Sequence, residues 1–319
     1  MEEAVLNTLR SRMGEHVSGE ELSHLVGVSR TAIWKEIERL REEGYKILAQ
    51  PHRGYQLISI PDRLTPQELS WNLQTERIGR RIYAYETTNS TMDIAHQLAS
   101  SGEPEGTVVV AEGQSKGRGR LGRGWVSPKG KGIYASVILR PALQFSEVPL
   151  VTLMTAVAVA KAVQSETGLA PEIKWPNDLM IGTKKIAGIL TELNAELNRV
   201  HYVILGIGMN VNASKTALPA YATSLGEEMK DKVDRLKLAR ALLIQLDQYY
   251  AGFLAQGSQP ILEAWRGFAF FLGRRVRVAA QGRMVDGQAV DVDSTGSLLV
   301  RTDTGLVESV TAGEVLVVR

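Results

Sequence analysis

Residues 113–132 have the sequence GQSKGRGRLGRGWVSPKGKG, which holds seven glycines, six basic residues and no acid. Glycine lets backbone amides approach an anion closely, and arginine binds phosphate through two parallel N–H groups. Composition alone leaves three interpretations open: a flexible basic surface loop, an RNA-binding tract and a phosphate-binding loop. The segment lies between two runs typical of strands, 107–112 and 133–139, and it includes an aromatic residue, Trp125. This placement inside a folded domain favours a loop that a ligand orders.

The sequence around this loop alternates between strand and helix patterns. Further strands are predicted at 172–175, 185–193 and 200–211, and helices at 90–101, 148–165, 236–253 and 260–268. Such alternation is typical of a mixed α/β domain. We place this domain at residues 63–270, because a segment with two prolines, residues 61–66, has the composition of a linker.

The first sixty residues have a different pattern. Apolar residues at helical spacing predict one helix near Val5, a second after Ser18 and a third after Ser29. Ser18 and Glu21 fit a capping box, in which each side chain bonds the other residue's backbone. Gly27 separates the second and third helices. The apolar face of the second helix is predicted to be formed by Leu22, Leu25 and Val26.

Two short β regions complete the predicted organisation. Residues 45–48 and 54–58 read as two strands, so residues 1–62 are predicted to form a winged helix-turn-helix. From Gly273 onward, short apolar runs alternate with Gly, Asp and Ser turns. This pattern predicts a small β-barrel domain at residues 271–319.

Composition limits the classes of protein to consider. The chain has 319 residues and no cysteine, which removes disulfides, thiolate metal sites and a cysteinyl intermediate. Its five histidines never fall at metal-ligand spacing, so no structural metal is expected. We find no apolar run of about 18 residues and no signal peptide at the start, so we expect a cytoplasmic protein. The net charge is only +2, so a nucleic-acid contact would need a local basic patch.

Three further motifs follow the glycine-rich loop. Residues 174–178 read KWPND, residues 185–190 read KIAGIL and residues 206–212 read GIGMNVN. Singly these are weak signals, since Lys185 could be a solvated strand end, Asp178 a turn cap and Asn210 an ordinary polar residue. The chain has no Gly-x-x-x-x-Gly-Lys-Ser/Thr motif, which excludes a P-loop nucleotide site.

Taken together, these motifs resemble those of the biotin–protein ligases. GRGRLGRGW at 117–125, KWPND, KIAGIL and GIGMNVN occur in that family's order and spacing, and Ser90-Thr91 matches its substrate-contact motif. With the amino-terminal winged helix, the chain resembles the bifunctional bacterial class that also represses biotin genes. The resemblance covers nearly the whole chain. It implies a class II synthetase-like ligase domain with a mixed sheet, followed by an SH3-like β domain.

The resemblance also implies residue roles. The catalytic residues would be Lys185, Arg118 and Asp178. Lys185 would lie between the biotin carboxylate and the α-phosphate, and Asp178 near the metal–phosphate group or the incoming lysine. The residues expected to bind biotin are Ser90, Thr91, Met92, Gln114, Arg118, Gly119, Arg120 and Lys185. The residues expected to bind ATP or the adenylate are Arg120, Trp125, Asn177 and Asn210.

Met92 departs from the family pattern. The family often has Asn or Gln after Ser-Thr, and a methionine there is as consistent with an apolar contact on the helix face as with a ligand contact.

The implied reaction uses ATP with Mg²⁺. The biotin carboxylate attacks the α-phosphorus, pyrophosphate leaves, and a lysine of a biotin carboxyl carrier protein then takes biotin from biotinyl-5′-adenylate. No protein nucleophile is needed, which agrees with the absence of cysteine. A ligase for another carboxylate such as lipoate, and a repressor that only senses biotin, are the alternatives. The intact cations and Asp178 argue against the sensor, and GRGR with KWPND favours biotin.

The prediction of DNA binding depends on where the charged residues lie within residues 1–60. Residues 1–60 hold eight basic residues and nine glutamates, a net charge of −1 without histidine. The residues expected to contact operator DNA lie on the third helix and the wing, and they are Ser29, Arg30, Thr31, Ala32, Trp34, Lys35 and Arg53. A winged helix used only for protein contacts is the alternative. Because one such domain contacts few bases, we expect a homodimer, favoured by bound biotinyl-adenylate and formed through an edge of the central sheet.

Overall fold

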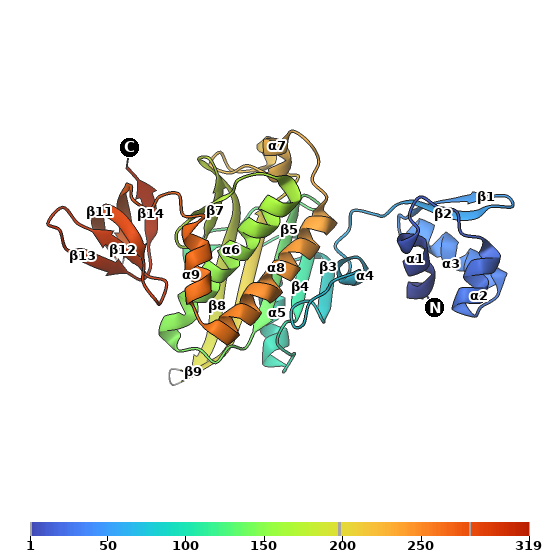
Figure 1. Ribbon diagram of the computed structural model, residues 1–319, viewed down its shortest axis with the longest axis horizontal. Coiled ribbons are helices and arrows are strands. Elements are labelled where there is room, and N and C mark those ends of the chain that lie inside the picture. Colours follow the sequence, from blue (N-terminus) through green and yellow to red (C-terminus); the bar gives the residue numbers. More distant parts are fainter. Residues whose placement is uncertain (1, 197–198, 281, 319) are drawn as a thin grey trace. The chain divides into compact units, whose positions relative to one another are not determined.

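The computed structural model describes residues 2–196, 199–280 and 282–318. The chain forms two compact units, Met1–Arg63 and Leu64–Arg319 (Figure 1). Each unit has its own buried core. The predicted domain boundaries at 62 and 270 stay predictions, since the second unit includes both the central domain and the carboxy-terminal strands.

The first unit is a three-helix domain with a β-hairpin. Its elements are α1 (Glu2–Ser11), α2 (Gly19–Val26), α3 (Arg30–Glu42), β1 (Lys46–Gln50) and β2 (Gly54–Ser59). Ser18 and Ser29 cap α2 and α3, since each hydroxyl accepts a hydrogen bond from the backbone N–H three residues later. Gly27 ends α2 at φ +70°, a conformation that favours glycine. The predicted helix-turn-helix is confirmed.

Two details of α2 differ from the sequence prediction. Glu21 does not return to the Ser18 backbone; its carboxylate instead lies 2.5 Å from the Arg12 guanidinium at the end of α1. The predicted apolar face is also narrower than expected. Leu22 is fully buried and Val26 packs against the core, but Leu25 is 57% exposed. The reason is that the small core reaches this eight-residue helix from one side only.

The second unit is built on a seven-stranded sheet with the order β3-β4-β5-β9-β8-β7-β6. Its strands are β3 (Ile82–Thr88), β4 (Val108–Gln114), β5 (Gly132–Leu139), β6 (Glu172–Lys174), β7 (Asp178–Ile181), β8 (Lys184–Glu196) and β9 (Arg199–Asn210). Only β3 and β4 are parallel among the described strands of this sheet. The predicted mixed sheet is therefore confirmed, although β3 and β7 were not predicted.

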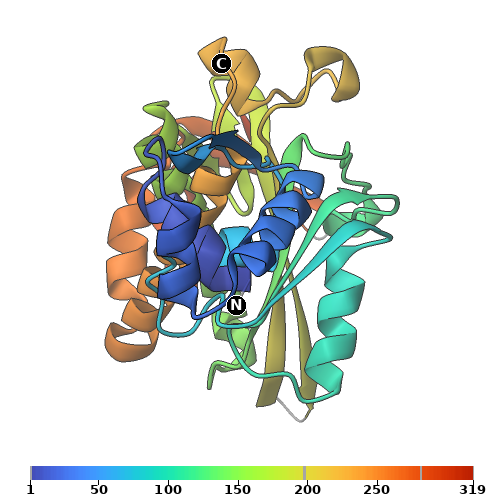
Figure 2. The ribbon, with the colours of Figure 1, turned by 90° about the vertical axis from the view of Figure 1, so that its right-hand side faces the viewer.

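Helices cover both faces of this sheet. On one face lie α6 (Val148–Thr167) and α8 (Arg235–Gln256), with α9 (Gln259–Arg266) beside α6, and on the other lies α5 (Thr91–Ser100) (Figures 1 and 2). Three short helices, α4 (Pro66–Ser70), α7 (Leu225–Met229) and a 3-10 turn at Arg120–Gly122, lie in connections. α6 with the turn before it, Phe145–Thr167, is long and apolar enough to cross a membrane. Most of that stretch is buried inside the unit, as expected for a core helix.

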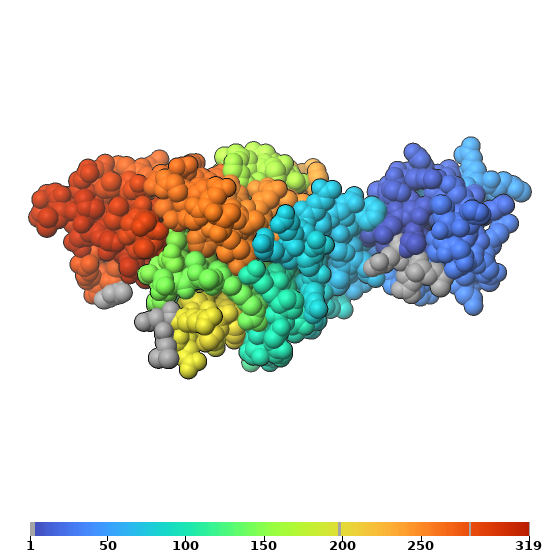
Figure 3. Space-filling view, turned by 60° about the horizontal axis from the view of Figure 1, so that its bottom comes forward, coloured from blue at the N-terminus to red at the C-terminus, as the bar shows by residue number. Residues whose placement is uncertain are grey.

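The carboxy-terminal region forms a second, antiparallel sheet with the order β13-β12-β11-β10-β14. Its strands are β10 (Arg275–Ala280), β11 (Arg283–Val292), β12 (Leu298–Arg301), β13 (Val307–Val310) and β14 (Glu314–Val317). The Trp175 indole N–H donates to the Gly296 carbonyl at 3.1 Å, and Arg266 pairs with Asp291 at 2.8 Å. The sheet thus packs directly against α9 and the β6 end of the seven-stranded sheet (Figure 3). The predicted small β domain is confirmed, although β13 was not predicted.

Candidate active site

Three adjoining cavities lie along the glycine-rich loop and strands β7, β8 and β9. We call them the α5 cavity, the basic cavity and the Tyr221 cavity. The α5 cavity is lined by Ser90, Thr91, Met92, Gln114, Arg118, Gly119, Trp125, Asn177, Lys185 and neighbouring strand residues. The basic cavity is lined by Arg120, Arg123, Lys174, Asn177, Asp178, Lys185, Tyr221, Glu314 and others. The Tyr221 cavity is lined by Trp125, Lys185, Asn210, Leu218, Tyr221 and others. Lys185 and Trp125 line all three, so the cavities meet at these two side chains.

One part of the α5 cavity is lined by uncharged polar side chains. Ser90 caps α5, its hydroxyl accepting from the Met92 N–H at 3.3 Å, and this places Thr91 in the first turn. The Thr91 N–H and hydroxyl both donate to the Gln114 side-chain carbonyl, at 2.9 and 3.2 Å. The Gln114 amide in turn donates to the Ser127 hydroxyl at 3.0 Å. Donors and acceptors that are fixed in this way suit a neutral, polar ligand group.

Met92 lies at the floor of the same cavity. It is 4% exposed and belongs to the apolar cluster between α5 and the sheet. Gly206 on β9 makes room for it, since a Cβ added there would lie 2.3 Å from the Met92 sulfur. Met92 therefore packs in the core and lines the cavity at once.

The glycine-rich loop folds as a hairpin. The Gly119 N–H donates to the Arg123 carbonyl at 2.7 Å, and the Trp125 N–H donates to the Gly117 carbonyl at 2.8 Å. At its tip Leu121 has φ +56° and is 77% exposed. Left-handed backbone is costly for leucine, so the loop holds some strain at its tip.

The indole of Trp125 lies on the sheet over two glycines. A Cβ added at Gly208 would lie 2.5 Å from the ring, and one added at Gly188 would lie 3.1 Å from it. The Lys185 ammonium is 5.3 Å from the ring centroid, within the range of a cation–π contact. The indole N–H is buried and has no hydrogen-bond partner within the described residues. A buried donor without a partner is costly, so this N–H is free for a ligand acceptor.

Lys185 forms an ion pair with Asp178 on the neighbouring strand. The Lys185 Nζ lies 2.6 Å from Asp178 Oδ1, with the two side chains 20% and 26% exposed. The sequence separation of seven residues corresponds to a tight β7–β8 hairpin, which brings both groups to one place. The Asp178 carboxylate therefore offsets part of the Lys185 charge that an incoming anion would meet.

Each of the three arginines of the loop contacts different partners. Arg118 pairs with Asp93 on α5 and with Glu192 on β8. Arg120 donates to Asn177 Oδ1 at 3.1 Å and to the Gly313 carbonyl at 3.3 Å. Burial lowers the pKa of Arg120, an effect that the nearby Asp178 carboxylate partly offsets.

Arg123 is the third of these arginines, and it pairs with Glu314. This hydrogen bond raises the pKa of Arg123 and lowers the pKa of Glu314. Together with the Gly313 contact, it shows that the carboxy-terminal sheet holds one side of the loop.

The two asparagines bond to the backbone. The buried Asn177 amide donates to the Ile189 carbonyl at 2.8 Å and so joins the β6–β7 turn to β8. The Asn210 amide, 2% exposed, donates to the Thr223 carbonyl at 3.1 Å. Each has a structural task, and each also lines a cavity.

Sequence reasoning missed four residues here. Asp93, Glu192, Glu314 and Tyr221 contact loop arginines or line the cavities. None lies in a glycine-rich or Trp-Pro-Asn-Asp motif. Two had a nearby signal, since Asp93 follows Ser90-Thr91 and Glu192 lies on the strand begun by KIAGIL.

The first unit offers a separate basic face. Ser29, Arg30, Thr31, Trp34 and Lys35 are exposed at the amino-terminal half of α3, where Ala32 is half-buried, and Arg53 is exposed in the hairpin turn. The carboxy-terminal half of α3 is different, because its arginines are neutralised. Arg39 pairs with Glu36 and Glu43, and Arg41 pairs with Glu38. Arg30, Lys35 and Arg53 have no ion pair within the described residues. Their unpaired positive charges lie at the start of α3 and in the hairpin turn, where the sequence predicts the DNA contacts.

Comparisons with known proteins identify relatives over nearly the whole chain. Family models match for an HTH domain at residues 2–56, for the Biotin/lipoate A/B protein ligase family at 84–210 and for the Biotin protein ligase C terminal domain at 271–318. The Bifunctional ligase/repressor BirA of Bacillus subtilis is 40% identical over 92% of this chain and 91% of its own length. That of Escherichia coli is 28% identical over 95% and 93%. The biotin protein ligase of Aquifex aeolicus in complex with biotin and ATP is 27% identical, with a TM-score of 0.66, and covers 75% of this chain and 99% of its own.

Proposed function

The chain belongs to the family of bifunctional biotin ligases and repressors, and on this premise we propose that its three adjoining cavities are where biotin and ATP react. It is a biotin–[acetyl-CoA-carboxylase] ligase, as relatives are named, joined to a helix-turn-helix repressor domain. The substrates are biotin and ATP, with which the similar Aquifex aeolicus ligase forms a complex. The reaction ends on a carboxyl carrier protein.

We assign one part of biotinyl-adenylate to each cavity. The neutral ureido group suits the α5 cavity, where Ser90, Thr91 and Gln114 present fixed donors and acceptors. The phosphates suit the basic cavity with Arg120 and Lys185. The adenine suits the Tyr221 cavity, and Trp125 and Asn210 line it. The observation that carries the proposal is the position of Lys185, which lines all three cavities as the cation between two reacting anions must.

The chemistry follows from charge. The biotin carboxylate attacks the α-phosphorus of ATP, the bond to the bridging oxygen breaks, and pyrophosphate leaves with that electron pair. Lys185 reduces the repulsion between the two anions, and with Arg120 it stabilises charge on the phosphate oxygens. Arg118 lines the α5 cavity and donates to the biotin end of the adenylate. The carrier lysine amine then attacks the acyl carbon, loses its proton, and expels AMP. Asp178 lies beside Lys185, where it can orient the ammonium or accept that proton. The loop over the site excludes water from the anhydride.

Mg²⁺ is expected to come with ATP. Among the described residues no group of three His, Asp or Glu could hold a metal ion by itself, so phosphate oxygens would supply most ligands. Asp178 is the carboxylate in the basic cavity best suited to add one, since Glu314 is held by Arg123. The ion would supply further positive charge beside the phosphates.

A pyrophosphate-exchange assay tests the ligase site. Purified protein should incorporate labelled pyrophosphate into ATP when biotin is present, and should label a biotin-carrier domain. Lipoate should support neither reaction, because its dithiolane ring cannot satisfy the Gln114 and Thr91 groups. Exchange that depends on lipoate and not on biotin would overturn the assignment of the α5 cavity.

We propose that the basic face of α3 and the hairpin turn contact operator DNA. A helix-turn-helix contacts bases through the start of its second helix, which in this chain is α3. The start of α3 carries exposed Thr31, Trp34 and Lys35. Lys35→Ala should weaken operator binding in a gel shift and reduce its salt dependence. Arg12→Ala is the matched control, because Arg12 pairs with Glu21 outside this face. Equal loss in both variants would contradict the proposed face.

We propose that the repressor form is a homodimer made through β8. Within the described residues β8 pairs with β9 along most of its length but with β7 only at 184–188, and Ile189 bonds to Asn177, so residues 190–196 have one open edge. An open edge is a template for a second strand. Biotinyl-adenylate should favour the dimer by ordering the neighbouring loop, and carrier protein should compete for the same face. Sedimentation with and without the adenylate tests this, and equal dimer affinities would refute it. We place these partners, and the protein, in the cytoplasm.

A further inference from the structure

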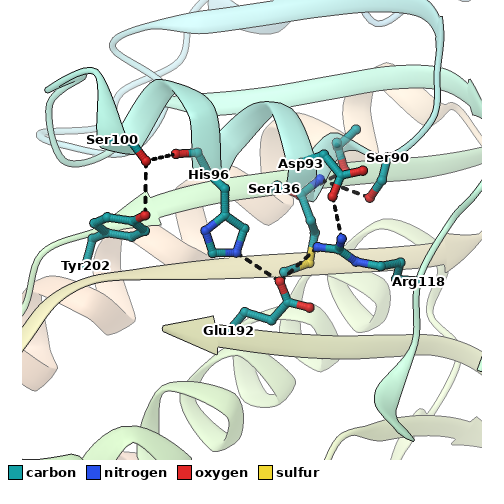
Figure 4. A network of polar contacts seen from close by, with 10 residues as sticks. Ser90, Asp93, His96, Ser100, Arg118, Ser136, Glu192 and Tyr202 are labelled. Carbon is teal, nitrogen blue, oxygen red and sulfur yellow. Dashed lines mark hydrogen bonds and ion pairs between the residues drawn. The ribbon is translucent and has the colours of Figure 1, made fainter. Parts of the chain in front are cut away.

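Arg118 lines the α5 cavity and is held by two carboxylates from different elements, α5 and β8. One guanidinium nitrogen donates to Asp93, in the first turn of α5, and another donates to Glu192 Oε2 on β8 at 2.8 Å. Figure 4 shows the guanidinium between the two acids. Asp93 follows Thr91 by two residues, and Glu192 follows Lys185 on the same strand. The two acids therefore tie the loop to the elements that carry the ureido and carboxylate contacts.

Glu192 is itself fixed by a histidine. The oxygen that accepts from Arg118 also makes a 2.9 Å hydrogen bond with His96 Nε2. The His96 ring meets the Tyr202 ring edge-on at 5.9 Å, and the Ser100 hydroxyl bonds to the His96 carbonyl (Figure 4). Glu192 is thus held in place even without the loop, as a preset partner for Arg118.

The other end of the loop is held independently. Arg120 contacts Asn177 and the Gly313 carbonyl, and Arg123 pairs with Glu314. The glycines between these anchors allow the backbone many conformations, so the position of each arginine depends on its side-chain partners. Without Asp93 and Glu192, nothing else in the described residues pairs with the Arg118 guanidinium.

We propose that Asp93 and Glu192 are positioning residues that hold Arg118 in place to contact biotinyl-adenylate. The inference rests on the proposed function, in which Arg118 touches the ligand. A guanidinium has five N–H donors, and two of them are used here, so three remain for the ligand. Prior fixing of the side chain lowers the entropy cost of each ligand contact. The acids also offset the charge of Arg118, so its donors act through geometry more than through charge.

The ion pairs are half-exposed, with side chains 33–46% exposed, and pairs of this kind add little to global stability. Asp93→Asn and Glu192→Gln should therefore leave the melting temperature near the wild-type value. They should increase the rate at which bound adenylate dissociates by about threefold to tenfold each, and raise the KM for biotin while kcat changes less. Glu263→Gln, an exposed glutamate on α9 that lines none of the three cavities, is the matched control and should behave as wild type.

A double-mutant cycle with Arg118→Ala tests whether Asp93 and Glu192 act through Arg118. If the acids act through Arg118, neither acid variant should increase adenylate release further once Arg118 is alanine. An equal additional loss in the Arg118→Ala background would overturn the inference, since the acids would then act by themselves. Wild-type release in Asp93→Asn and Glu192→Gln, with fast release in Arg118→Ala, would overturn it too while leaving the proposed function intact. Wild-type release in Arg118→Ala would instead refute the assigned contact of Arg118 with the ligand.

Discussion

Lys185→Ala should slow adenylate formation by about 10²–10³, the usual cost of losing one preorganised contact to developing charge. The structure adds a second contribution. Asp178 lies 2.6 Å from the lysine ammonium and loses this partner when the lysine is removed. Repulsion between this carboxylate and an incoming anion is of the order of 1 kcal/mol in a partly solvated site, or about fivefold in rate. Asp178→Asn added to Lys185→Ala should therefore recover about fivefold.

The assay is biotin-dependent pyrophosphate release at saturating biotin and ATP, measured before transfer to any carrier. Lys184→Ala is the matched control, because adjacent residues on a strand point to opposite faces and Lys184 lines none of the three cavities. Wild-type release by Lys185→Ala would refute the placement of this lysine. A double variant slower than Lys185→Ala would show that Asp178 has a chemical role beyond balancing charge.

Three further outcomes are expected. Arg120→Gly removes the contacts with Asn177 and Gly313, so activated biotin should escape and label bystander proteins more than wild type does, as measured by avidin blot; equal labelling would contradict the role of the loop. Glu314→Ala frees Arg123 and should raise the KM for ATP severalfold while the KM for biotin stays near wild type, and steady-state kinetics that show the reverse would contradict this anchor. Removal of residues 1–63 should abolish operator binding in a gel shift yet leave a folded, active ligase, because that unit has its own core; an insoluble or inactive fragment would argue against it.

Elements with a strong apolar pattern were predictable from the sequence. The long buried strands β5 and β9 and the helices α6 and α8 follow their periodicity closely. The strand β3 was missed because it lies at the sheet edge and is mostly exposed, so it lacks the usual alternation. Such an edge strand forms because it pairs with the adjacent strand, and the local sequence pattern does not predict this pairing.

The candidate site shows the same division. Local motifs indicated the loop, Lys185 and Asp178, and the short β7–β8 hairpin brings the last two together. The partners of the loop arginines could not be predicted, because Glu192 lies 74 residues from Arg118 and Glu314 belongs to a different sheet. Ion pairs between distant segments depend on how whole helices and strands pack, so the spacing of residues in the sequence does not predict them.

The close fit of Trp125 over Gly188 and Gly208 has a consequence for genetics. A strain whose growth depends on this ligase should lose viability when Gly208 becomes alanine, because the new methyl group would lie 2.5 Å from the indole. Revertants that keep the alanine should arise at codon 125, through a smaller apolar residue that restores space above the strand. Residues 125 and 208 should accordingly vary together among descendants of such a strain, and an alanine at 208 should be rare wherever tryptophan is retained.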